Sequence, residues 1–134
     1  MTTVRAKKVE RGTLYLAATG VALHVAPADG KKFIYEELKE AVGGFIHEMV
    51  PAQAGDKVWV NEEGALHGLP LNPRTWEFAS RRVYLELNAM IYPPDWLAKG
   101  NALRVYRAIA GSFESRLAGL SIKQALHREK AVTL

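Results

Sequence analysis

The chain contains no cysteine among its 134 residues. Disulfide bonds, thiolate metal ligands and thiol nucleophiles are therefore excluded, and the composition suits a reducing compartment. No stretch approaches the ~18 apolar residues that a transmembrane helix needs, and the basic start of the chain leads into no apolar signal-peptide core. We therefore expect a soluble, cytoplasmic protein without a membrane partner.

Sequence motifs of common catalytic and nucleotide-binding sites are also absent. None of the patterns GxxxxGK[ST], GxGxxG and GxSxG occurs in the chain. His47-Glu48 begins like a zinc-protease motif, but Pro51 stands where the second histidine is required. The other histidines, His24, His67 and His127, are isolated along the chain. We therefore predict no enzymatic activity, no metal ion and no cofactor.

The remaining composition is that of a folded protein. Hydrophobic residues make up 49% of the chain and charged residues 24%, which is ordinary for a soluble globular domain. No repeat or low-complexity linker divides the sequence. We therefore expect one domain over residues 1–134, with a core at about 13–110 and a helical tail at 111–134.

The net charge of +4 is distributed unevenly along the chain. Residues 1–12 carry four basic and one acidic side chain, and residues 104–134 carry six basic and two acidic ones. Residues 29–77 carry five basic and nine acidic side chains, a net of −4. Basic ends beside an acidic middle favour contact with a polyanion, although mildly basic ends are also common as solvated surface.

The first part of the chain predicts a strand pair, a helix and a short strand. Residues 13–26 hold two runs rich in Leu, Val and Tyr around a Thr-Gly pair, which is typical of a β-hairpin. Apolar residues at helical spacing predict an amphipathic helix from residue 33 to 42. Gly43-Gly44 ends this helix, because glycine adopts the left-handed C-terminal conformation freely. A strand is expected at 45–50.

The stretch NEEGALHGLPLN, residues 61–72, follows a predicted strand at 57–60. Its NEEG tetrapeptide predicts a tight turn, since asparagine is favoured at the first position and glycine at the last. We expect residues 65–71 to return antiparallel to 57–60 as the second arm of a hairpin. Asn72-Pro73 then predicts the start of a helix that runs to about residue 88. Its apolar face would carry Trp76, Ala79, Val83 and Leu87.

The last third predicts a strand at 101–110 followed by the helical tail. Ser121 and Gln124 have the spacing of a capping box, which indicates a helix that begins after Gly119. One apolar face of the tail would carry Phe113, Leu117 and Leu120. These elements predict an α+β domain, a small antiparallel sheet with two or three packed helices.

A nucleic-acid surface is one interpretation of the basic and aromatic residues in the second half. Aromatic side chains near arginines are typical of single-strand binding, and the segment at 114–126 has the rhythm of a helix-turn-helix. Core aromatics with solvated arginines, and a tail helix packed on the sheet or on a second subunit, explain the same residues. The aromatics concerned are Trp59, Trp76, Trp96, Tyr84, Tyr92 and Tyr106. The candidate nucleic-acid contacts are Arg81, Arg82, Arg104, Arg107, Arg116 and Lys123.

Two segments, YEELKEAVGGFIHEMVP and VWVNEEGALHGLPLNP, resemble an uncharacterised small domain found in many bacteriophage, plasmid and other mobile-element genes. The resemblance covers residues 21–74 and departs at 93–106, where PPDWLAKGNALRVY replaces the family's usual closing strand. It implies no activity and no catalytic residue. The motif positions that we regard as structural are Gly43, Gly44, Asn61, Glu62, Glu63, Gly64, Gly68, Pro70 and Asn72.

The resemblance implies a non-enzymatic accessory protein of phage or mobile-element type. We expect it to bind a host or phage protein, such as a defence or transcription complex, through a sheet edge or the tail helix. Two alternatives stay open from the residues: a nucleic-acid-binding module that uses the basic ends, and a binder of a small nucleotide ligand. An unblocked edge strand and the amphipathic tail also leave a homodimer open.

Overall fold

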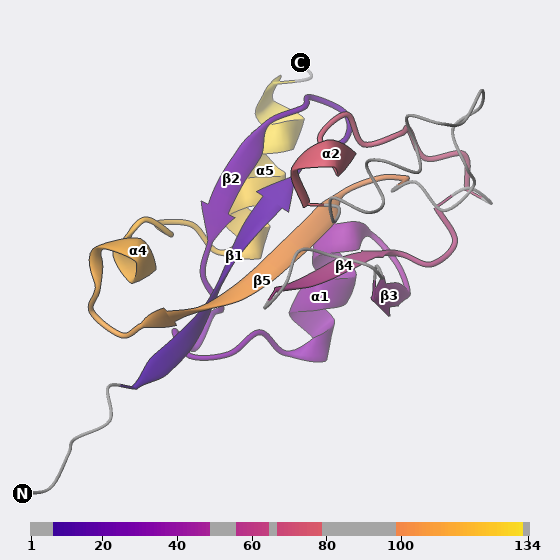
Figure 1. The fold of residues 1–134 in the computed structure, drawn as a ribbon. Coiled ribbons are helices and arrows are strands. Elements are labelled where there is room, and N and C mark those ends of the chain that lie inside the picture. The colour runs from indigo at the N-terminus through magenta and orange to yellow at the C-terminus, as the bar shows by residue number, and fades with distance from the viewer. Residues whose placement is uncertain (1–6, 49–55, 65–66, 79–98, 133–134) are drawn as a thin grey trace, which may run out of the picture.

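The chain forms an antiparallel sheet whose central strand comes from late in the sequence (Figure 1). The computed structural model describes residues 7–48, 56–64, 67–78 and 99–132. Five strands lie in the order β2-β1-β5-β4-β3, and every neighbouring pair is antiparallel. The strands are β1 (Lys8–Tyr15), β2 (Ala22–Val25), β3 (Ile46–Glu48), β4 (Lys57–Asn61) and β5 (Ala102–Ile109).

Strand β5 joins two local strand pairs into one sheet. It pairs with β1 along its full length, from Lys8 opposite Ile109 to Tyr15 opposite Ala102. Its other edge pairs with β4, where Lys57 lies opposite Val105. The hairpin predicted at 13–26 is confirmed, and β1 also includes the basic residues before it.

Helices α1 (Tyr35–Val42) and α5 (Ile122–Val132) cover one face of the sheet (Figure 1). Two shorter helices, α2 (Thr75–Phe78) and α4 (Phe113–Arg116), flank the sheet. Helix α1 ends as predicted, since Gly43 has φ +78° and its N–H donates to the carbonyl of Lys39 at 2.8 Å. The α+β class with an antiparallel sheet and packed helices is therefore confirmed.

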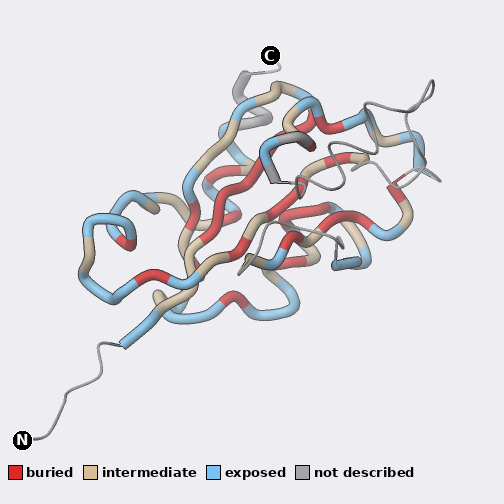
Figure 2. The backbone as a smooth tube through the Cα atoms, in the orientation of Figure 1, coloured by how far each residue is buried: buried red, intermediate tan, exposed pale blue. Residues whose placement is uncertain are grey.

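The hydrophobic core lies between the sheet and these two helices. In Figure 2, the buried residues of this core lie along the central strands of the sheet. Leu14 on β1 and Leu103 on β5 are fully buried, and truncation of such a side chain to alanine costs about 2–5 kcal/mol. The predicted tail takes part, since Ile122 and Ala125 of α5 belong to the same core cluster.

The capping box predicted for the tail helix is present. The Ser121 N–H donates to Oε1 of Gln124 at 2.9 Å, and the Gln124 N–H donates to Oγ of Ser121 at 3.2 Å. Two N–H groups at the start of α5 are thereby satisfied by side chains of the same turn.

The predicted return strand at 65–71 is wrong. Strand β4 pairs with β3 on one edge and with β5 on the other, so neither edge is left for this segment. Of the described residues in the segment, Leu71 alone makes a strand-like contact, a single bridge to Lys99. Ala65 and Leu66 lie outside the described residues.

The predicted apolar face of the tail is also wrong. Helix α4 ends at Arg116, so Phe113 and Leu117 do not continue into a longer helix and are 73% and 45% exposed. Leu120 forms a parallel bridge with Val25 instead of joining a helical face. The four residues of α4 are too few for the first helix of a helix-turn-helix.

Several predictions fall on residues that the structure does not describe. Helix α2 begins at Thr75, soon after Asn72-Pro73 as predicted, and is described as far as Phe78. The expected continuation through Ala79, Val83 and Leu87 lies beyond it, as do Arg81, Arg82, Tyr84, Tyr92 and Trp96. Within the described ranges, each helix is too short or too polar to cross a lipid bilayer.

Candidate functional site

The asparagine of the NEEG motif joins α1 to the end of β4. The side chain of Asn61 is buried, and its Nδ2 donates to the carbonyl of Val42 at 3.0 Å. Its Oδ1 accepts the N–H of Glu63 at 2.8 Å, which fixes the turn. A Cβ on Gly44 would lie 2.9 Å from Nδ2 of Asn61, so this glycine permits the close approach. Asn61 and Gly44 therefore join the end of α1 to the turn after β4.

A second motif asparagine holds three segments together. Asn72 is 1% exposed, and its Nδ2 donates to the carbonyls of Tyr15 and Gly100, both at 3.0 Å. Its Oδ1 accepts the N–H of Arg74 at 3.0 Å at the start of α2. Gly64 lies against the same region, because a Cβ there would be 2.6 Å from the carbonyl oxygen of Lys99.

The two motif glutamates, Glu62 and Glu63, do not form a buried pair of acids. Glu62 is exposed, and Glu63 contacts His67 at 3.0 Å in an exposed pair of little energetic weight. Gly68 has φ +64°, and the carbonyl of Pro70 accepts the N–H of Gly100 at 2.7 Å. These motif residues therefore shape a loop and bring no reactive groups together.

A shallow cleft of about 320 Å³ lies where the segments VGG (residues 42–44) and GLP (residues 68–70) meet. Its polar side chains are Glu40 and Asn101. The Asn101 amide is already used, since Oδ1 accepts the N–H of Ala17 at 3.0 Å and Nδ2 donates to the carbonyl of Ala41 at 3.3 Å. Among its described lining residues, this cleft therefore offers the carboxylate of Glu40 for recognition.

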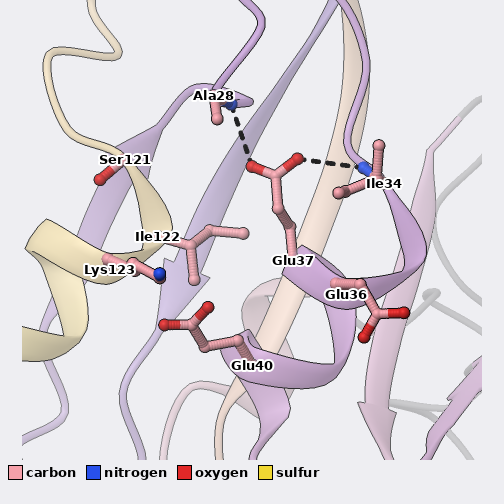
Figure 3. A pocket seen from close by; sticks show the side chains of 8 residues that line it. All are labelled: Ala28, Ile34, Glu36, Glu37, Glu40, Ser121, Ile122 and Lys123. Carbon is pink, nitrogen blue, oxygen red and sulfur yellow. Dashed lines mark hydrogen bonds between the residues drawn. The ribbon is translucent and has the colours of Figure 1, made fainter.

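Another cleft of about 320 Å³ lies between α1 and the start of α5 (Figure 3). Both carboxylate oxygens of Glu37 are engaged, accepting the N–H groups of Ala28 at 3.0 Å and Ile34 at 3.1 Å. Figure 3 shows Glu40 of α1 and Lys123 of α5 extending into the space between the two helices. Glu37 thus stabilises the start of α1, and the cleft combines an apolar floor with charges of both signs.

A strongly charged cleft of about 420 Å³, which we call the basic cleft, lies at one end of the sheet. It collects cations from four separate segments, namely β1, the loop between β2 and α1, β4 and β5. Glu10 is its only acidic lining residue among those described. The lining residues are Lys8, Val9, Glu10, Lys31, Lys32, Lys57 and Arg107.

The backbone that carries Lys31 and Lys32 is held by two carboxylates. Oδ1 of Asp29 accepts the N–H groups of Lys31 at 2.7 Å and Lys32 at 3.0 Å. These two hydrogen bonds, that of Lys32 foremost, lower the pKa of Asp29. Glu10 holds the other end, because its N–H donates to the carbonyl of Lys31 at 2.7 Å and its Oε1 accepts the N–H of Phe33 at 2.9 Å.

The predicted nucleic-acid contacts are spread over the molecule. Arg107 lies in the basic cleft, whereas Arg104 lies on the opposite face of the sheet, with Nε 3.7 Å from Oδ2 of Asp56. Arg116 is exposed on α4, and Lys123 is exposed on α5. The structure therefore brings one of the described candidates into the basic cleft.

The candidate contacts named from the sequence include none of the four lysines of the basic cleft, although Lys8 lies in the basic segment 1–12. Lys31, Lys32 and Lys57 come from the segment whose net charge is negative, so a tally along the chain hides them. One local signal was present: Asp29-Gly30 predicts a turn, and a turn followed by two lysines displays both side chains at the surface.

The face of the sheet that carries Arg104 holds an unsatisfied buried hydroxyl. Thr13 lies opposite Arg104 in the register and is 5% exposed. Its Oγ1 and the Nε of Arg104 are buried without a hydrogen-bond partner. Burial, the largest cause, raises the pKa of Tyr15 on the same face, and burial likewise raises that of Tyr106. In the part of the chain that the structure describes, no three acidic or histidine side chains are grouped to hold a metal ion.

Comparison with known proteins assigns the chain to a family. No curated protein and no solved structure matches the chain significantly. A family model described as a domain of unknown function, DUF3846, matches residues 13–113, a longer segment than the 21–74 that carries the motif resemblance. Since this match covers most of the chain, the protein belongs to the DUF3846 family.

Proposed function

We propose that this domain binds nucleic acid through the basic cleft. The observation that carries the proposal is the convergence of five cationic side chains from four segments around one carboxylate. Within the described ranges none of the five forms an ion pair, so their charge is available to a ligand. A grouped set of unpaired cations attracts phosphates and raises the rate of encounter with a polyanion.

The fixed backbone beneath Lys31 and Lys32 supports the same proposal. Three hydrogen bonds with Asp29 and Glu10 hold this dipeptide in place, and a fourth holds the next residue, Phe33. Little backbone ordering therefore remains to be done on binding. The long lysine side chains stay free to follow a phosphate backbone. Binding by this means depends on counterion release and therefore weakens steeply as salt rises.

The experiment is a fluorescence-anisotropy titration of labelled oligonucleotides over a salt series. The test variant is Lys31→Gln with Lys32→Gln, and the matched control is Arg116→Gln with Lys123→Gln, which removes the same charge outside the cleft. We expect the test variant to bind at least about tenfold more weakly than wild type. The salt slope, which is the slope of the logarithm of the binding constant against the logarithm of the salt concentration, should become smaller in magnitude by about 2. The control is expected to bind within about threefold of wild type.

Two results would count against the proposal. Absence of binding to any oligonucleotide at low salt would remove it altogether. Equal weakening in the test and control variants would show a diffuse attraction to net charge, without a role for the cleft. Thermal unfolding of each variant checks that the fold is retained.

An exposed aromatic pair supports a second candidate, binding to a protein. Tyr35 and Phe45 are 50% and 56% exposed, and Nζ of Lys39 lies 5.4 Å from the centroid of each ring. Aromatic side chains such as Tyr and Phe are enriched at protein interfaces relative to the rest of the surface. With the motif resemblance, this favours a phage or mobile-element accessory protein whose partner is a host or phage protein.

The two candidates are separated by a double variant, Tyr35→Ser with Phe45→Ser. If the aromatic pair binds a protein, a partner captured by wild type is lost with this variant and retained with Lys31→Gln, Lys32→Gln. Capture that is equal for all three proteins would refute this use of the aromatic pair. The readout is quantitative mass spectrometry of material bound to immobilised protein.

A further inference from the structure

The cations of the basic cleft form a row that crosses the strands. Glu10 pairs with Lys31 through the backbone on one side and lies opposite Arg107 on the other. Lys57 lies opposite Val105, two residues from Arg107, and Lys8 lies two residues from Glu10. Because side chains alternate along a strand, Lys8, Arg107 and Lys57 are on one face of the sheet.

The length of this row can be compared with the spacing of phosphates. From the Lys31–Lys32 segment to β4 the row crosses three strand spacings of ~4.8 Å, or about 14 Å. A nucleic-acid strand in a double helix advances ~3.4 Å per phosphate, so the row extends over about four phosphates along the axis. Five cations therefore match the charge of one short run of backbone.

The described lining of the cleft does not include the side chains that hold unstacked bases. No aromatic residue is among its described lining residues. Tyr106 is in β5 but lies opposite Arg11 on the other face, where the guanidinium of Arg104 is 5.5 Å from its ring centroid. Trp59 packs against the hydrophobic core. Single-strand binding proteins usually gain affinity by stacking bases on such rings, and the described lining of the cleft offers none.

The cleft also has few groups that could read a base sequence. Its described lining has no Asn, Gln, Ser or Thr, and Arg107 is its single arginine among lysines. The polar exception is Glu10, which already accepts the N–H of Phe33 through Oε1. Lysine contacts phosphate as a point charge, which fixes position on a helix and carries no sequence information.

We infer that the ligand of the basic cleft is the phosphate backbone of a double helix, bound without readout of base sequence. This inference rests on the proposed function and names the form of nucleic acid that the cleft takes. The row of cations meets a ready-made, regularly spaced line of phosphates in a duplex. A single strand would have to be ordered on the protein, and no ring among the described lining residues would stabilise it by stacking.

The test is competition at low salt against one labelled DNA duplex of about 20 base pairs, a length that exceeds the row of about four phosphates several times. The competitors are an unlabelled AT-rich duplex, a GC-rich duplex, an RNA duplex and the separated strands, all of equal length. We expect the duplexes to compete at least about tenfold better than the strands, and the two DNA sequences to agree within about threefold. The direct titration of the duplex should give a salt slope of about −4.

A variant of the one acidic residue adds an independent readout. Glu10→Gln removes the negative charge from the cleft and keeps an oxygen that can accept the N–H of Phe33. We expect it to tighten duplex binding by about three- to tenfold without creating a sequence preference. Unchanged or weaker binding, with the fold intact, would contradict a row of cations limited by Glu10.

The outcomes separate this inference from the proposed function. Tighter competition by single strands, lost in Lys31→Gln, Lys32→Gln, would refute the duplex and leave nucleic-acid binding standing. A difference above about tenfold between the two DNA duplexes would refute binding without sequence readout. Failure of every oligonucleotide to bind at low salt would overturn both.

Discussion

Replacement of Asn72 by alanine tests how much the motif loop stabilises the sheet. The side chain makes three hydrogen bonds: two buried ones donated to the carbonyls of Tyr15 and Gly100, and a partly buried one accepted from the N–H of Arg74. Each net hydrogen bond is worth about 1 kcal/mol, and a buried carbonyl left without a donor adds to the loss. We expect Asn72→Ala to lower the free energy of unfolding by about 3–5 kcal/mol.

A urea titration followed by circular dichroism measures this loss. With a slope of about 1.5–2 kcal/mol per molar, typical of a domain of this size, the midpoint should fall by about 2 M. Asn101→Ala is the matched control, because its amide makes two hydrogen bonds and is only partly buried. We expect that control to cost about 1–2 kcal/mol.

Asn72→Asp separates the role of the donor from that of side-chain size. The introduced carboxylate keeps an acceptor for Arg74 but faces two carbonyl oxygens, which raises its folded pKa above the unfolded value. Its most favourable contribution is therefore present below the unfolded pKa and is lost as pH rises through the folded pKa. The variant should be less stable relative to wild type at pH 7 than at pH 4. A loss under about 1 kcal/mol for Asn72→Ala, or no pH dependence for Asn72→Asp, would refute the role assigned to Asn72.

Three further predictions concern single positions. Gly64→Ala should lower the free energy of unfolding by about 3 kcal/mol, because its Cβ would meet the backbone of Lys99. Gly43→Ala should lower it by about 1 kcal/mol, because its Cβ would lie in open space and only the backbone at φ +78° is strained. A larger loss for Gly43→Ala than for Gly64→Ala in urea titrations would contradict this packing. Thr13→Val should leave stability unchanged or raise it by about 1–2 kcal/mol, since the buried hydroxyl has no partner, and a clear loss of stability would show that it has one. In an NMR titration, the pKa of the Asp29 carboxyl should lie below the usual range of an exposed aspartate. Its contribution to stability is therefore present above the unfolded pKa and is lost as pH falls through the folded pKa. A pKa in the usual range would contradict its hydrogen bonds to the N–H groups of Lys31 and Lys32.

Local sequence patterns predicted the parts of the fold that depend on near neighbours. The helix before Gly43-Gly44 and the Ser121–Gln124 capping box follow from contacts between residues three or four apart. The antiparallel class also followed from short runs of strand-forming residues. The pairing of β4 was mispredicted because the nearest following segment was chosen. Its real partners are β3, which precedes it, and β5, which comes some forty residues later in the chain.

The candidate site was harder to predict because charge converges in space and not along the chain. Arg104 and Arg107 were treated as one surface, yet residues three apart on a strand lie on opposite faces. That part of the error could have been avoided from the sequence, once residues 101–110 were taken as a strand. The meeting of Lys31 and Lys57 with Arg107 depends on the strand order, which no local pattern contains.

The central position of β5 has a consequence for how the chain folds. The β1–β2 and β3–β4 pairs can form from neighbouring segments. Each pair, however, has an inner edge whose backbone N–H and C=O groups stay unpaired until β5 is added. Lys8 and Ile109, about a hundred residues apart, must meet before the sheet is continuous, and such distant pairing slows folding. Until then both inner edges are open to strands of other chains. During synthesis the protein should therefore be most prone to aggregate in the interval before residue 109 has emerged.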